Sequence, residues 1–261
     1  RDSSRFIFTR INIGLPFQSG HNSIVFGFGY LSLLFKYQKS TPMSKKLYPD
    51  SKIELTSTIA KHYDSIMNLV TFGKYHDFIR RAIGLIELKP GCRVLDMGCG
   101  TGRNAALLKE RMDDDSRLTG IDISPQMERQ FRDRFSNDER FDFFSQRIDV
   151  PLELGTKYDV VVISFVIHGF PQEIRKKILQ NAVDHLAVEG RLYILDYNEF
   201  DMERMPAHHR FVFKTVECKY AFDFLNYDWK SILKDYGLGE FTEKLFYNQY
   251  VRLLSARKQD S

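Results

Sequence analysis

The sequence predicts an α/β fold, and three observations carry this prediction. From residue 93 onward, short apolar runs alternate with helical patterns, which requires crossover connections and a parallel sheet covered on both faces. A glycine-rich turn follows the first of these runs. Near the other end, the strand-like runs 241–246 and 250–255 are separated by three residues, too few for a helical crossover. We therefore expect a Rossmann-like, doubly wound sheet of seven strands, mostly parallel, with a C-terminal antiparallel hairpin.

The elements follow from periodicity and from local signals at their ends. Apolar residues at helical spacing predict helices over 53–70 and 74–86. Ser124-Pro125 is an N-cap followed by proline at the first helical position, where its missing N–H costs nothing. The expected order after residue 92 is strand 93–97, helix 102–111, strand 117–121, helix 125–135, strand 141–147, strand 158–164, helix 171–186, strand 191–196, helix 228–236 and the hairpin.

Composition excludes several classes of protein. The net charge of +4 resides in residues 1–43, which hold five basic side chains against Asp2, so the remainder is balanced and shows no nucleic-acid footprint. No apolar run reaches the roughly 18 residues that span a bilayer. The three cysteines are well separated, which argues against disulfides or structural zinc and fits a reducing compartment. We expect a cytoplasmic protein.

The first 42 residues differ from the rest in composition. No acidic residue occurs between Asp2 and Asp50, and Met43-Ser-Lys-Lys has the form of a natural start. We expect residues 1–42 to be a leader or extension outside the fold, with a transit segment or a genuine extension as alternatives. Residues 43–261 are expected to form a single domain.

The stretch Val94–Asn104 (VLDMGCGTGRN) places three glycines directly after a strand that contains Asp96. Gly98, Gly100 and Gly102 are spaced G-x-G-x-G, whereas the dinucleotide fingerprint that seats a pyrophosphate is G-x-G-x-x-G. A carboxylate before the loop would repel a pyrophosphate and favour an ammonium or sulfonium group. The loop therefore indicates a ligand with a cationic amino-acid end.

Two further acids follow the next two strands. Asp122 closes the strand 117–121 and is placed to accept both hydroxyls of a ribose, with Ile123 beside it to pack on a purine. Asp149 follows the strand 141–147, where its carboxylate would accept a hydrogen bond from an adenine amino group or merely cap a turn. The carboxyl ends of parallel strands are where an open α/β sheet binds its ligand.

With these residues the sequence resembles the class I S-adenosylmethionine-dependent methyltransferases, over roughly residues 60–256. The resemblance implies that Asp96 and the glycines contact the methionine part of S-adenosylmethionine, Asp122 the ribose and Asp149 the adenine. We also expect Cys99, Met127 and Ser164 to line this site.

A finer resemblance concerns the ubiquinone/menaquinone C-methyltransferases, in which a Tyr-Asp pair precedes Ser/Thr-Phe-Gly. Here Tyr63-Asp64 precedes Thr71-Phe72-Gly73, and Ile163-Ser-Phe165 also matches. The resemblance implies that helices in 43–90 cover the cofactor, with Tyr63 in contact with it. The sequence departs from that family at Val166-Ile-His-Gly169, where the family has Arg-Asn, so a quinol acceptor remains one alternative among small molecules.

Two regions are placed to hold the methyl acceptor. His168 follows the strand 158–164 on the ligand side and is a candidate general base for a phenol or hydroquinone, with loop structure as the alternative role. The segment 197–226 is long for a connection, is rich in aromatic residues and is expected to form an acceptor lid.

The expected function is methyl transfer from S-adenosylmethionine to a small molecule, possible acceptors being quinols or other aromatics. A protein or nucleic-acid methyltransferase, or a non-catalytic S-adenosylmethionine-binding protein, is the alternative. The pair His208-His209 with Glu217 and Cys218 lacks a metal-ligand pattern, and we expect no metal.

Overall fold

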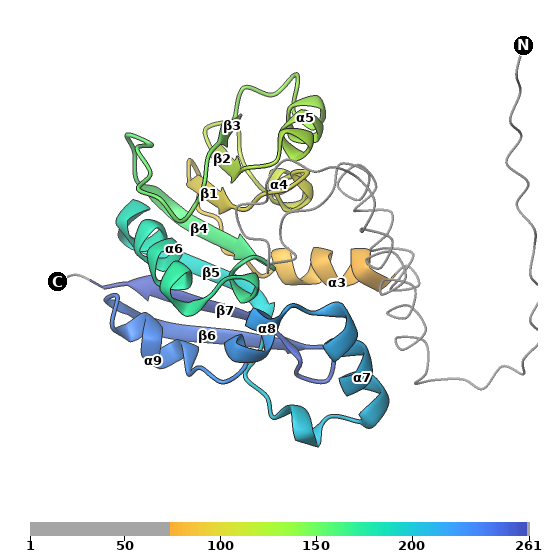
Figure 1. The fold of residues 1–261 in the computed structure, drawn as a ribbon. Coiled ribbons are helices and arrows are strands. Elements are labelled where there is room, and N and C mark those ends of the chain that lie inside the picture. The colour runs from red at the N-terminus through yellow and green to blue at the C-terminus, as the bar shows by residue number, and fades with distance from the viewer. Residues whose placement is uncertain (1–73, 260–261) are drawn as a thin grey trace, which may run out of the picture.

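Seven strands lie in one sheet in the order β3-β2-β1-β4-β5-β7-β6 (Figure 1). Strands β1 to β5 pair in parallel, and β7 is antiparallel to both of its neighbours, β5 and β6. This arrangement in the computed structural model, which describes residues 74–259, confirms the predicted fold class. The strands are β1 Arg93–Met97, β2 Arg117–Asp122, β3 Phe141–Ser145, β4 Tyr158–Ser164, β5 Leu186–Tyr197, β6 Leu238–Phe246 and β7 Val251–Lys258.

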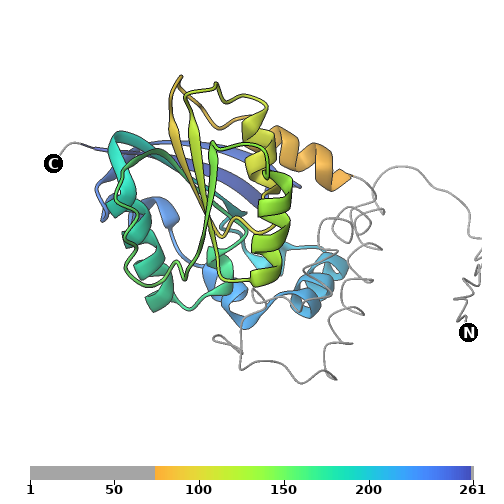
Figure 2. The ribbon, with the colours of Figure 1, turned by 90° about the horizontal axis from the view of Figure 1, so that it is seen from above.

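Helices cover both faces of the sheet, as Figure 2 shows from above. The helices are α3 Lys74–Ile83, α4 Arg103–Lys109, α5 Pro125–Arg134, α6 Gln172–His185, α7 Ala207–Val216, α8 Lys219–Phe224 and α9 Trp229–Lys234, with short 3-10 turns η2 Ile167–Gly169 and η3 Met202–Arg204. None of the helices in residues 74–259 combines the length and apolar character needed to cross a membrane.

Alternation along the strands creates two apolar layers. In β1, Leu95 and Met97 belong to the layer under α6 and α9, whereas Val94 belongs to the layer under α3, α4 and α5. The central strands β1 and β4 are buried on both faces, as is typical of parallel strands that helices cover on both sides. The parallel register brings the ends of β1, β2, β4 and β5 to one edge of the sheet.

The hairpin between β6 and β7 turns where the sequence predicts it. Tyr247, Asn248 and Gln249 all have positive φ, at 48°, 54° and 72°. Such angles suit a tight connection between antiparallel strands. Strand β3 is shorter than predicted and ends at Ser145, whereas β5 is longer and begins at Leu186.

The segment 197–226 leaves the end of β5 and returns to α9, and it contains η3, α7 and α8. In both ribbon views, α7 and α8 lie at the edge of the sheet where β4 and β5 end (Figures 1 and 2). Helix α8 packs against η2, which follows β4. The predicted helix 53–70, Tyr63 and the segment 1–42 lie outside the described residues.

Candidate active site

The glycine loop joins β1 to α4 and places its three glycines at positive φ. A Cβ on Gly98 would lie 2.5 Å from Val166, and a Cβ on Gly102 would lie 2.7 Å from Phe131, so these two positions need glycine for packing. A Cβ on Gly100 would meet nothing within 4 Å among the described residues. The sequence predicts that all three glycines contact the ligand. In the structure, only Gly100 of the three has free space beside its Cα within the described residues.

Asp96 lies on β1 directly before this loop and is completely buried. Neither of its carboxylate oxygens has a hydrogen-bond partner among residues 74–259. Burial, reinforced by the charge of Asp122, raises the pKa of Asp96 to about 7. A buried carboxylate without a donor is costly, and a cationic ligand at this position would supply the missing partner.

Asp122 ends β2 and is held against the same loop. Its Oδ2 accepts a hydrogen bond of 3.0 Å from Gly100 N–H, and its Oδ1 accepts one of 2.9 Å from Ser124 N–H. Burial raises the pKa of Asp122, and the backbone donors partly oppose that effect. Ile123 is half-buried beside it, and the buried Met127 donates its N–H to Ser124 Oγ at 3.3 Å, which caps α5. The two carboxylates Asp96 and Asp122 therefore flank one loop.

Two other predicted lining residues lie in the same region. Cys99 is buried in the loop, and burial, with the charges of Asp96 and Asp122, raises the pKa of its thiol well above the ordinary value. The thiol therefore stays protonated and is a poor nucleophile. Ser164 is the half-buried last residue of β4, opposite Leu195 of β5.

Asp149 follows β3 and is 5% exposed. Both of its carboxylate oxygens accept hydrogen bonds from Arg147, at 3.0 Å to Nε and 2.7 Å to Nη2. The carboxylate is thus engaged by a neighbouring side chain, and its contact with adenine stays a prediction.

His168 lies in η2, just beyond the end of β4. Its Nδ1 is 2.7 Å from Oδ1 of Asp196, which is 1% exposed near the end of β5. The backbone N–H of His168 donates to the other oxygen of the same carboxylate at 3.3 Å, and Tyr197 N–H donates to Oδ1 at 2.8 Å. Because a carboxylate accepts, Nδ1 carries the proton and Nε2 is the nitrogen left for chemistry.

Glu217, which ends α7, faces that second nitrogen. Its Oε2 is 3.7 Å from His168 Nε2, and its Oε1 accepts a 2.7 Å hydrogen bond from the hydroxyl of Tyr197. Burial by itself lowers the pKa of His168, but Asp196 and Glu217 together outweigh it and raise that pKa. The imidazole therefore has a higher affinity for a proton than an exposed histidine.

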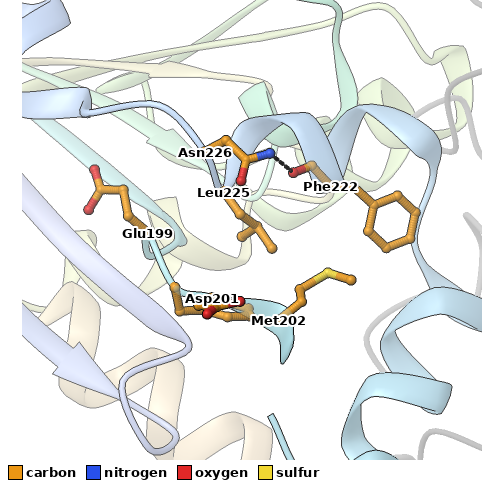
Figure 3. Close-up of a pocket in the computed structure, with 7 residues that line it drawn as sticks. Glu199, Asp201, Met202, Phe222, Leu225 and Asn226 are labelled. Atoms are coloured by element: carbon orange, nitrogen blue, oxygen red, sulfur yellow. Dashed lines mark hydrogen bonds between the residues drawn. The ribbon is translucent and has the colours of Figure 1, made fainter. Parts of the chain in front are cut away.

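A row of aromatic rings from the segment 197–226, called the insertion below, begins next to His168. The ring of Tyr197 lies 5.1 Å from His168 and 5.1 Å from Phe213, and Phe213 lies 5.6 Å from Phe222. A cavity of about 510 Å³ lies between the segment that follows β5 and helix α8, and Phe222 of this cluster lines it (Figure 3). It is lined by Glu199, Phe200, Asp201, Met202, Phe222, Leu225 and Asn226.

Sequence reasoning missed Asp196, and it treated Glu217 only as a metal ligand of doubtful pattern. Asp196 is the sole acid in the buried run that ends β5, and that position was a usable signal. Nothing in the sequence pairs Glu217 with His168, because 49 residues separate them and only the docking of α7 and α8 brings them together.

Comparisons with known proteins bear on the family to which the chain is similar. Residues 94–190 match a family model described as a methyltransferase domain. The chain is 29% identical over 153 residues to a ubiquinone/menaquinone biosynthesis C-methyltransferase of Xanthomonas oryzae pv. oryzae, a match that covers 58% of this chain and 60% of that protein. It is 32% identical over 144 residues to a demethylmenaquinone methyltransferase of Thermus thermophilus, covering 54% and 63%. The matched part is thus about three fifths of the length of these relatives.

Solved structures share the fold at low sequence identity. A crystal structure of a putative O-methyltransferase from Nostoc punctiforme has a TM-score of 0.61 at 16% identity, covering 91% of this chain and 70% of that one. An O-methyltransferase family protein from Burkholderia thailandensis has a TM-score of 0.59 at 17% identity, covering 91% and 72%. At such identities the likeness establishes the fold alone.

Proposed function

Because residues 94–190 form a methyltransferase domain of the class I S-adenosylmethionine-dependent type, we propose that this chain methylates a small molecule that carries an acidic hydroxyl group. The donor side of the proposal and the acceptor side rest on different residues, which lie along the same edge of the sheet.

The observation that carries the donor side is the buried Asp96 carboxylate. It has no hydrogen-bond partner among the described residues, and its charge interacts with that of Asp122, whose Oδ2 accepts a hydrogen bond from Gly100 N–H. S-adenosylmethionine, when bound, supplies an electrophilic methyl group on a sulfonium and carries an ammonium. These residues fit it, since a cation satisfies Asp96 and bare backbone at Gly100 admits close approach.

The remaining donor contacts follow the strand ends. Asp122 accepts hydrogen bonds from Gly100 N–H and Ser124 N–H, which supports the proposal that its carboxylate also accepts the ribose hydroxyls. Ile123 and Met127 would line the adenine side, with Asp149 as its polar contact. Tyr63, outside the described residues, is proposed to cover the donor from the N-terminal side.

His168 is the proposed general base on the acceptor side. Asp196 holds Nδ1–H, so Nε2 is available to accept the proton of the acceptor hydroxyl. Removal of that proton makes the oxygen, or a ring carbon conjugated with it, a stronger nucleophile for the methyl group. Asp196 and Glu217 then stabilise the imidazolium that forms.

The acceptor class is inferred from this base and from its surroundings. An aromatic hydroxyl compound, such as a hydroquinone, would lose a proton to His168 and pack against the rings of Tyr197 and Phe213. The two curated relatives described above are named for quinone methylation, which supports the same class. The insertion 197–226 would act as the lid over this acceptor.

Binding of S-adenosylhomocysteine tests the donor side without knowledge of the acceptor. We expect this product to raise the melting temperature of the protein, and Asp96→Ala to abolish the shift. A matched control is Asp142→Ala, which changes an exposed carboxylate on the edge strand β3. An unchanged melting temperature at millimolar ligand would contradict the proposal.

A further inference from the structure

Arg175 on α6 is a completely buried arginine that the donor and acceptor sites do not explain. Its helix is the crossover between β4 and β5. A buried guanidinium is costly unless each of its N–H groups has a hydrogen-bond acceptor. The acceptors of Arg175 therefore show which elements of the fold its side chain connects.

The partners of Arg175 come from two elements far apart in the chain. From η2, the backbone oxygens of Ile167 and His168 accept bonds of 3.1 Å from Nε and 3.2 Å from Nη2. From α8, the backbone oxygen of Tyr220 accepts a bond of 2.5 Å from Nη2, and Asp223 accepts one of 2.9 Å from Nη1. One nitrogen, Nη2, thus bonds both the carbonyl of His168 and the insertion.

The fifth N–H of Arg175 also donates a hydrogen bond, and aromatic rings lie close to its guanidinium group. Nη1 donates to Gln172 Oε1 at 3.2 Å, one turn earlier on α6. The guanidinium carbon lies 5.1 Å from the ring centre of Phe224 and 5.8 Å from those of Tyr227 and Trp229. Phe224 in turn lies edge-on to His168, with 6.5 Å between ring centres. The contacts fix the arginine in one place.

We propose that Arg175 is a positioning residue that locks the acceptor lid and the His168 turn into one unit, so that His168 is seated on Asp196 when α8 is docked. The carbonyl of His168 is anchored by Arg175 while its ring is anchored by Asp196. If α8 leaves, Arg175 loses Tyr220 and Asp223 and is left as a buried cation with too few acceptors. Closure of the lid and placement of the base are therefore coupled through one side chain.

This inference rests on the proposed function only for the role of His168 as a base. The coupling itself is a property of the folded chain, so it is measurable without the acceptor. The informative variant is Arg175→Lys, which keeps a positive charge near His168 but cannot reach five acceptors with three N–H groups.

The first measurement is the pH titration of the His168 ring by NMR, assigned by comparison with His168→Gln. In the wild-type protein we expect a pKa raised by Asp196 and Glu217 against the opposing effects of burial and of Arg175. In Arg175→Lys we expect that pKa to fall toward the ordinary imidazole value, because the ring leaves Asp196. Since lysine preserves the charge, the fall reports displacement of the ring.

The second measurement is hydrogen exchange of the α8 amides, which should become at least tenfold faster in Arg175→Lys. S-adenosylhomocysteine affinity should stay within about threefold, because Asp96 and Asp122 make no contact with Arg175. The matched control is Arg132→Lys, an exposed arginine paired with Glu128 on α5, which should change none of these values.

A wild-type titration of His168 and wild-type α8 exchange in Arg175→Lys would overturn the inference. Failure of the wild-type protein to bind S-adenosylhomocysteine would instead overturn the proposed function. If Arg175→Lys does not fold, Asp223→Ala decides, because it keeps the guanidinium and removes its side-chain acceptor on α8. It should raise α8 exchange and lower the pKa of His168 in the same directions, and no change in either would contradict the coupling.

Discussion

Nδ1 of His168 and Oδ1 of Asp196 lie 2.7 Å apart, although 28 residues separate them in the chain. They meet because β4 and β5 are neighbours in the sheet, with Ser164 opposite Leu195, and each residue lies just beyond or at the end of its strand. The contact fixes which nitrogen of the imidazole carries a proton. In the proposed function, this contact marks the acceptor end of the site.

Replacement of His168 by glutamine tests its role as a base. We expect His168→Gln to lower the rate of methyl transfer by about 10²- to 10⁴-fold, the usual contribution of a positioned general base. Affinity for S-adenosylhomocysteine, measured by calorimetry, should not change. The control is His76→Gln on α3, where the side chain is exposed. Full activity of His168→Gln would leave the histidine a structural role only.

Asp196→Asn should alter the pH dependence of activity. The raised pKa of His168 means that the base is ionised, and inactive, over a wider range of low pH. Loss of the Asp196 charge lowers that pKa, so the acidic limb of the pH–rate profile should move to lower pH while the maximal rate falls. An unmoved limb would show that another group controls it.

Stability gives an independent measure of the same pair. Because folding raises the pKa of His168, the pair stabilises the folded protein fully below the ordinary value of 6.5. This stabilisation is lost as the pH rises through the raised pKa. The difference in melting temperature between wild type and Asp196→Asn should therefore shrink with rising pH in that range. A difference that grew with pH would contradict the assignment.

Asp96 makes ligand affinity depend on pH. Its pKa of about 7 without ligand means that the carboxyl group is mostly protonated at pH 6 and mostly ionised at pH 8. A cationic ligand needs the ionised form, so the affinity for S-adenosylmethionine should be about tenfold higher at pH 8 than at pH 6. Calorimetry in Asp96→Asn should show weaker binding without this increase. Equal slopes in both proteins would exclude Asp96 as the source.

The free energy of unfolding of the unliganded protein should fall as the pH rises, whereas the ligand affinity rises. Folding raises the pKa of Asp96 from 3.8, so the protonated carboxyl stabilises the folded state below that value, and the effect is lost as the pH rises toward 7. In Asp96→Asn, the melting temperature measured without ligand should not show this decrease with rising pH.

Two alanine variants distinguish a glycine that the packing of the loop requires from a glycine that ligand binding is proposed to require. Gly98→Ala places a Cβ 2.5 Å from Val166 and should destabilise the protein strongly. Gly100→Ala meets no described atom within 4 Å and carries only the cost of a φ of +54°, about 1 kcal/mol. Its main effect should be a loss of S-adenosylhomocysteine affinity, compared by calorimetry and thermal unfolding. Equal losses of stability in both variants would contradict this distinction.

The donor half of the site could be predicted because its signals are local. Asp96, the glycines and Asp122 lie at strand ends that periodicity locates, and parallel strands bring those ends to one edge. Gly237, which directly follows the predicted helix 228–236, has a φ of +73°, a backbone angle that glycine adopts readily. The assignment of contacts to these residues stays a prediction, because binding has to be measured.

The acceptor half could not be predicted to the same depth. The pair His168–Asp196 forms because β4 and β5 are neighbours in the sheet. The pair His168–Glu217, in contrast, depends on docking of the segment 197–226, which no periodicity encodes. Arg175 is one of several basic residues on α6, and only the fold shows that it is the buried one. The aromatic residues of 197–226 indicate packing, whether on a core or on an acceptor, and composition does not distinguish the two.

Transfer of a labelled methyl group tests directly whether the protein methylates a small molecule and whether His168 is needed for that reaction. The protein is incubated with methyl-labelled S-adenosylmethionine and cell extract, and the label is counted in lipid, small-molecule, protein and nucleic-acid fractions, with His168→Gln in parallel. We expect label in the lipid or small-molecule fraction, on a hydroxyl-bearing aromatic compound, and no label with His168→Gln. Label confined to protein or nucleic acid, or no transfer by a protein that binds the donor, would contradict the proposed function.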